Sequence, residues 1–143
     1  MTVCNTVHNV NSKTAMQLVQ HAVKKAQDMG IEISVCVVDT YGFIMAQWCT
    51  DNARFQTKDF AYNKAFTAVA MQSDTSEWYD KVKSNAQVLQ GLTNRDSRFM
   101  VFPGGTPLKY KGVCIGAIGI SGGSADEDKY IVTHCLGACG LDK

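Results

Sequence analysis

The segment from Val113 to Gly123 constrains the fold more than any other part of the chain. It is a β-branched run typical of a buried strand, yet Gly116, Ala117 and Gly119 interrupt it. A central strand normally avoids glycine, because glycine loses chain entropy on folding and adds no packing. We therefore expect another group to approach this backbone closely. Two groups could approach it: the alanine-rich helix expected over residues 57–71, or a bound ligand. The strand residues by themselves favour the helix.

Hydrophobic periodicity changes along the chain and predicts alternating helices and strands. The expected elements are a helix over 13–29 ending at Gly30, a hairpin over 31–49, a helix over 57–71, a helix that follows a capping box at Asp74–Glu77 and ends at Gly91, strands over 99–102 and 113–120, and a final helix opening at Asp126. The segment Pro103–Pro107 is expected to interrupt a central strand. Hairpins without regular β–α–β alternation indicate an α+β fold with helices packed on an antiparallel sheet, which we expect to form one domain over 1–143.

Composition excludes several classes of protein. The chain has 143 residues, enough for one domain with a real core, and its 14 basic and 13 acidic residues give a formal charge of +1. That balance argues against a nucleic-acid binder and against a basic membrane-surface patch. No apolar run approaches the ~20 residues that span a bilayer, and the N-terminus lacks the pattern of a signal peptide. We expect a cytoplasmic protein whose six cysteines are reduced thiols.

Two glycine pairs stand beside the predicted strands and suggest a ligand site. Gly104 and Gly105 lie between the strands expected over 99–102 and 113–120, and Ser121, Gly122 and Gly123 follow the second of them. Backbone N–H groups gathered at one rim can bind a carboxylate or another anion. Neither loop is a P-loop, and the acidic residues 126–128 would repel phosphate from the last helix. Plain turns explain the same glycines equally well.

Two charged residues are candidate catalytic groups. Asp39 ends a buried strand, where it can accept hydrogen bonds within a turn or transfer a proton. Lys64 lies among alanines on the helix over 57–71. A lysine there can extend to solvent, the commoner case. If it were desolvated, its pKa would fall and it could bind a carboxylate or act as a base.

The three histidines, His8, His21 and His134, lie far apart in the sequence. His21 stands at the border of the apolar stripe of the first helix, and His8 belongs to a terminus expected to be exposed. A zinc site from Cys4, His8, Cys135 and Cys139 can be drawn, but its spacings match no standard zinc pattern.

Several segments occur together in an order typical of one family: Val37-Val38-Asp39 with Gly42, Asp51 with Ala53, Ala61 with Lys64-Ala65 and Ala68, Gly104-Gly105-x-Pro107, Ile115 to Gly123, and Glu127-Asp128. On these motifs residues 12–140 resemble the GlcG/HbpS-like family, which includes the C-terminal domain of PduO-type corrinoid adenosyltransferases. The resemblance implies a profilin-like fold, with an antiparallel sheet of about five strands, assembled into homo-oligomers. Cys49 and Asn52 stand where many members have Arg and Gly.

The resemblance also implies candidate functions, since members are linked to haem binding or degradation and others to glycolate, propanediol or glycerol metabolism. The first hypothesis is a haem- or tetrapyrrole-binding protein with an apolar pocket near a subunit interface and His21 as axial ligand. The alternative is an enzyme or accessory protein for a polar acid, aldehyde or diol. In that case Gly104, Gly105, Gly116 and Ser121–Gly123 would line the ligand site, and Lys64 or Asp39 would transfer a proton. A structural oligomeric module is a third hypothesis.

Overall fold

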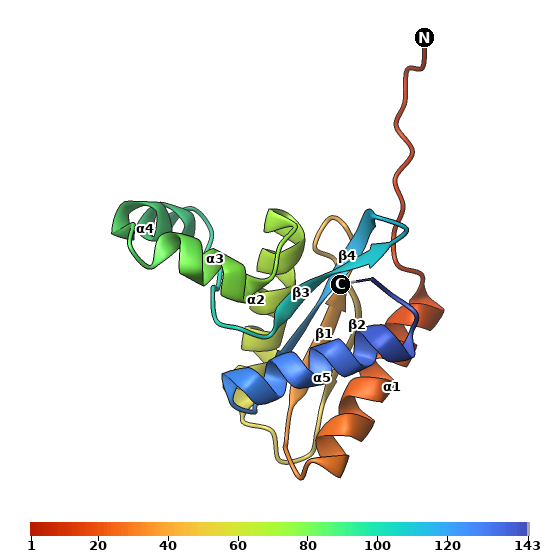
Figure 1. Ribbon diagram of the computed structural model, residues 1–143, viewed down its shortest axis with the longest axis vertical. Coiled ribbons are helices and arrows are strands. Elements are labelled where there is room, and N and C mark those ends of the chain that lie inside the picture. Colours follow the sequence, from red (N-terminus) through yellow and green to blue (C-terminus); the bar gives the residue numbers. More distant parts are fainter. Residues whose placement is uncertain (143) are drawn as a thin grey trace.

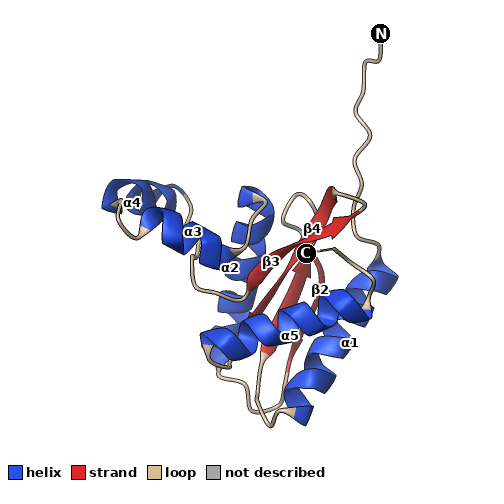
Figure 2. Ribbon diagram, in the orientation of Figure 1, coloured by secondary structure: helices blue, strands red, loops and turns tan. Residues whose placement is uncertain are grey.

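The computed structural model describes residues 1–142. Five helices and four strands follow one another along the chain (Figures 1 and 2). They are α1 (Ser12–Asp28), β1 (Ser34–Val38), β2 (Ile44–Cys49), α2 (Phe55–Met71), α3 (Thr75–Val82), α4 (Ala86–Arg95), β3 (Gly105–Tyr110), β4 (Val113–Ser121) and α5 (Ala125–Ala138). The strands form one antiparallel sheet in the order β2-β1-β4-β3. The expected α+β class is therefore confirmed.

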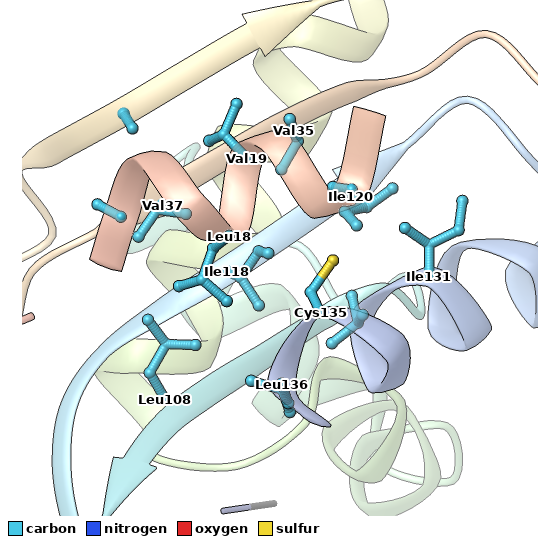
Figure 3. Close-up of a cluster of buried hydrophobic side chains, with 14 of the residues drawn as sticks. Leu18, Val19, Val35, Val37, Leu108, Ile118, Ile120, Ile131, Cys135 and Leu136 are labelled. Atoms are coloured by element: carbon cyan, nitrogen blue, oxygen red, sulfur yellow. The ribbon is translucent and has the colours of Figure 1, made fainter. Parts of the chain in front are cut away.

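Helices cover both faces of the sheet. Helices α1 and α5 lie side by side on one face, and α2 covers the other (Figure 1). Successive residues of β1 and β4 point to opposite faces, so each strand contributes to two apolar clusters. The larger cluster joins α1 and α5 to the sheet (Figure 3) and includes Leu18, Val35, Val37, Leu108, Ile118, Ile120, Ile131, Cys135 and Leu136. The smaller cluster joins α2 to the sheet through small side chains such as Ala61, Ala65 and Ala117.

Helix α2 makes the close approach that the glycines of β4 require. A Cβ added to Gly119 would lie 2.1 Å from the carbonyl oxygen of Ala61 and 2.6 Å from the amide nitrogen of Ala65. No side chain fits between the strand and the helix backbone, which explains why this β4 position is glycine and why the facing helix is rich in alanine. Of the two neighbours that the sequence allowed here, the helix is the one present.

The expected strand count of about five is wrong, because residues 99–102 do not join the sheet. Side chains satisfy their backbone groups instead: Thr67 Oγ1 accepts from the Met100 amide at 2.8 Å, and Thr75 Oγ1 donates to the Phe102 carbonyl at 2.6 Å. The segment Pro103–Pro107, which was expected to interrupt a strand, instead contributes its last three residues to β3. Its proline is tolerated because β3 is an edge strand, where one side needs no ladder hydrogen bond.

The single helix expected between the capping box at Asp74–Glu77 and Gly91 is divided in two. Helix α3 ends at Val82, and α4 begins after Asn85, whose side chain accepts from the Val88 amide at 3.2 Å as an N-cap. Gly91 lies inside α4 and does not end it. The two helices project from the body of the molecule (Figure 1). Within residues 1–142 no helix combines the length and hydrophobicity needed to cross a membrane.

Candidate functional site

Lys64 forms a buried ion pair with a residue of the last helix. Its ammonium Nζ lies 3.2 Å from Asp128 Oδ2 and donates to the Ile120 carbonyl oxygen at 2.8 Å. The two side chains are 5% and 3% exposed, so the alternative in which Lys64 extends to solvent is wrong. Burial lowers the pKa of Lys64 and raises the pKa of Asp128, while the charge of each partner acts in the opposite direction.

The two glycine loops meet around this ion pair, as the sequence suggested they would meet at one rim. A Cβ on Gly104 would lie 3.1 Å from Lys64 Nζ and 3.2 Å from Asp128 Cβ. The Gly123 amide donates to Asp128 Oδ1 at 2.9 Å, and the Gly105 amide donates to Thr75 Oγ1 at 3.1 Å. The loops therefore surround a carboxylate, and that carboxylate belongs to Asp128 of the same chain.

Asp39 lies at the opposite end of β1 from this centre. Lys64 contacts Ile120, which pairs with Val35 near the start of β1, whereas Asp39 follows the last residue of that strand. Asp39 Oδ1 accepts from the amides of Tyr41 at 2.9 Å and Phe43 at 3.0 Å, which is the predicted turn role. The structure does not bring the two candidate catalytic residues together.

A polar groove opens beside the second glycine loop. It has a volume of about 530 Å³ and is lined by Gly30, Ile31, Glu32, Asn52, Arg54, Gln56, Thr57, Phe60, Ser121, Gly122, Gly123, Ser124 and Glu127. Arg54 is its one cationic side chain within the described chain. Glu32 Oε2 accepts from the Asn52 amide, and Glu127 Oε1 accepts from the Ser124 amide. Of the predicted ligand-binding residues, Ser121, Gly122 and Gly123 thus face a groove. Gly116 does not line it, because it lies toward the other end of β4, next to the residue that pairs with Val38.

A second, more apolar groove lies between the chain before α1 and the β3–β4 hairpin. Its volume is about 540 Å³, and its lining residues are His8, Asn9, Val10, Asn11, Thr14, Tyr110, Lys111, Val113, Ile115 and Leu141. The Val10 amide donates to the Ile115 carbonyl oxygen at 2.7 Å, which holds the segment against β4. The Thr40 amide also donates to Asn9 Oδ1 at 3.0 Å. This anchoring places His8 at the groove.

His21 faces a different neighbour. It lies on α1 at the border of the buried stripe, half-buried, and its ring packs edge-on against that of His134 on α5. Val23 stands on the other border of α1, where it lines a groove with Trp48 of β2. His21 lines neither that groove nor the apolar groove at His8.

Two of the cysteines are buried and unreactive, and the zinc site drawn from the sequence is absent from the described residues 1–142. Burial raises the pKa of Cys36 and of Cys135 to about 12, so both are thiols at neutral pH. The zinc site drawn from Cys4, His8, Cys135 and Cys139 is not formed, since residues 1–142 hold no group of three or more His, Cys, Asp or Glu side chains suited to a metal ion.

Comparison with known proteins decides the family. A family model described as "Haem degrading protein HbpS-like" matches residues 10–136. The chain belongs to the HbpS-like family. The match agrees with the family resemblance that the sequence motifs indicated. The motif positions Gly104–Gly105 and Gly122–Gly123 enclose the Lys64–Asp128 pair here, so in this HbpS-like chain they have a structural role.

Several relatives cover most of this HbpS-like chain. The corrinoid adenosyltransferase PduO of Salmonella typhimurium is 34% identical over 122 residues, which are 85% of this chain and 36% of that protein. A solved structure named as a PduOC:haem complex is 32% identical, with a TM-score of 0.86 over 94% of this chain and 97% of that one. Protein ORFY of Klebsiella pneumoniae is 27% identical, with a TM-score of 0.91 over 100% and 99% of the two chains. The chain thus spans about a third of the PduO protein.

Proposed function

We propose that this protein is a cytoplasmic, homo-oligomeric haem- or tetrapyrrole-binding member of the HbpS-like family, with its ligand in the apolar groove at His8. The observation that carries the proposal is the similarity to a chain solved with haem, which spans 94% of this sequence at 32% identity. The groove supplies the residues for such a ligand. A volume of about 540 Å³ lies within the range of small-molecule and cofactor sites.

The lining of the groove suits an amphiphilic macrocycle. Val10, Val113 and Ile115 present an apolar wall, and Lys111 stands at the same groove, where its charge can pair with a carboxylate. His8 offers an imidazole nitrogen, the proximal haem ligand of many haem proteins. When bound, haem would supply redox-active iron chemistry. The protein's part is to bind it, to orient it and to limit its contact with water.

The sheet edge supports the homo-oligomeric part of the proposal. Strand β2 is an edge strand with an unpaired side. Large apolar side chains are exposed on it and next to it, at Phe43 and Trp48, and Phe55 at the start of α2 is 91% exposed. Exposed edges and apolar side chains of this kind are usually covered in native proteins, and a second copy of the chain would cover them.

A hemin titration followed in the Soret band tests the proposal. We expect wild-type protein to bind one hemin per chain with a shifted Soret maximum. His8→Ala should weaken binding at least about tenfold, a loss of roughly 1.4 kcal/mol, because the axial donor is removed. His21→Ala is the matched variant and should bind like wild type.

Two results would change this conclusion. An unchanged spectrum on adding hemin to wild-type protein would exclude haem as the ligand. Loss of binding in His21→Ala with full binding in His8→Ala would assign the axial donor to α1, as the sequence alone predicted.

A second candidate function, binding of a small carboxylate for catabolism of a polar acid, is favoured by Arg54 in the polar groove. Arg54 can pair with a carboxylate while the loop Ser121–Gly123 offers polar contacts. We expect glycolate at millimolar concentration to raise the melting temperature of wild-type protein by mass action, and Arg54→Gln to abolish that rise. Arg95→Gln, at the end of the projecting α4, is the control. An equal rise in Arg54→Gln and wild type would contradict this assignment.

A further inference from the structure

Two histidines from different helices face each other on the outer side of the molecule. The rings of His21 on α1 and His134 on α5 have centroids 6.4 Å apart, with an angle of 75° between their planes. One of them is half-buried and the other is exposed, so the space between them is open to solvent on one side. Neither histidine lines the groove assigned to haem above.

The packing of the two helices fixes this arrangement. Lys25 lies four residues after His21, and Tyr130 lies four residues before His134. The Lys25 ammonium stands 5.0 Å from the centre of the Tyr130 ring. His21 thus contacts His134, and Lys25, one helical turn later on α1, contacts Tyr130, one turn earlier on α5. The two helices therefore run antiparallel here. Leu18 and Cys135 beneath the pair are fully buried, so the backbones that carry the two histidines are firmly held.

We infer that His21 and His134 together bind one divalent transition-metal ion, with water in the remaining coordination positions. Neutral imidazole is a preferred ligand of Zn²⁺, Ni²⁺ and Cu²⁺. Within residues 1–142 no third His, Cys, Asp or Glu completes the cluster. The site is therefore a two-residue chelate, weaker than a closed structural zinc site.

The rings stand slightly farther apart than a shared tetrahedral ion requires. A metal about 2.1 Å from an imidazole nitrogen lies about 3.2 Å from the ring centre, so a tetrahedral angle places two ring centres about 5 Å apart. The observed 6.4 Å thus requires the rings to approach by about 1 Å. Side-chain rotation supplies that movement, because at least His134 is free to turn into solvent.

The charges around the pair allow a cation. Lys24 and Lys25 on α1 are positive, but Lys24 is paired with Asp28. Asp28 also interacts electrostatically with His134, and its own pKa is lowered, chiefly by the hydrogen bond from Lys24. Lys25 is directed over the Tyr130 ring. These three charges sum to +1, so the ion has to be held by the two imidazoles and not by local negative charge.

The proposed metal site and the groove at His8 use different residues, since neither His21 nor His134 lines that groove. The metal site and the proposed haem site are therefore separate and can be tested separately.

Isothermal titration with Ni²⁺, in the absence of hemin and with a non-thiol reductant present, tests the inference. We expect wild-type protein to bind one Ni²⁺ per chain. His21→Asn and His134→Asn should each weaken binding at least tenfold, because a single imidazole has no chelate partner. His8→Asn, which changes the remaining histidine of the chain, should bind like wild type.

Thermal melts of the same proteins supply a second readout. Without metal the variants should melt close to wild type, since the substituted side chains are at least partly exposed. With Ni²⁺ only wild type and His8→Asn should gain stability by mass action. Undiminished Ni²⁺ binding in either His21→Asn or His134→Asn, as exposed cysteines such as Cys4 and Cys49 would give, overturns the inference. So does the absence of binding to wild type. Neither result bears on hemin binding at His8.

Discussion

Asp128→Ala is expected to lower the free energy of unfolding by about 3–5 kcal/mol, because it leaves the Lys64 ammonium buried without a counter-charge. The pair is 3.2 Å apart, and both side chains are almost fully buried. The Gly123 amide would lose its acceptor as well. Lys64→Met should be similarly destabilising, since it leaves the buried Asp128 carboxylate without a counter-charge. Urea denaturation followed by circular dichroism measures both losses.

Two further variants separate the ion pair from a general sensitivity to substitution. The double variant Lys64→Met/Asp128→Leu should be more stable than either single variant, because no unpaired charge stays buried. Asp80→Ala removes an exposed partner of Lys83 and should cost at most about 1 kcal/mol. If Asp128→Ala were no worse than Asp80→Ala, the buried pair would not hold the two glycine loops together.

Gly119→Ala is the second large effect that we expect. The added methyl would lie 2.1 Å from the Ala61 carbonyl oxygen, so α2 would have to move away from the sheet. Overpacking against a helix backbone should lower the free energy of unfolding by about 3 kcal/mol or more. The same denaturation measurement applies.

Gly137→Ala is the matched control for this substitution. Gly137 lies in α5, is exposed, and a Cβ there would meet nothing within 4 Å. Alanine is the better helix former, so this variant should gain up to about 1 kcal/mol. A Gly119→Ala protein within about 0.5 kcal/mol of wild type would contradict close packing of α2 on β4.

Local pattern predicted the elements whose signal is local. The apolar stripe over 13–29 with Gly30, the hairpin over 31–49 and the β-branched strand from Val113 are all observed, with bounds shifted by a few residues. The sequence failed where side chains from elsewhere decide the backbone. Residues 99–102 are strand-like, but Thr67 and Thr75 on α2 and α3 bind their backbone groups. Likewise Pro107 could be placed in a strand only once β3 was known to be an edge.

The sequence indicated which groups could form the candidate site, but not which residue pairs with Lys64. The sequence allowed the glycine loops to gather around a carboxylate, with plain turns as an equal alternative, and it allowed a desolvated Lys64 to bind a carboxylate or to act as a base. Nothing local shows that the carboxylate is Asp128, because 64 residues separate it from Lys64. The signal that could have pointed to it is the run of three acidic residues in the first turn of the last helix, shortly after Gly123, although the sequence does not say which of the three turns inward.

The groove at His8 was missed for a similar reason. The residues before α1 carry no helical or strand pattern, so they were expected to form an exposed terminus. The hydrogen bond from Val10 to Ile115 fixes this segment to β4, and no pattern in residues 1–10 encodes that contact. The His21–His134 pair depends in the same way on how α1 and α5 pack, which only the tertiary structure shows.

The Lys64–Asp128 ion pair links the helices on the two faces of the sheet. The lysine comes from the helix on one face of the sheet and the aspartate from a helix on the other, and they meet at the C-terminal end of β4, where Lys64 also binds the Ile120 carbonyl oxygen. If the helices on either face moved away from the sheet, the charged residue on the other face would be left buried without its counter-charge. The two sides of the molecule are expected to open in a single concerted event, so neither can serve as a hinged lid while its counterpart stays closed.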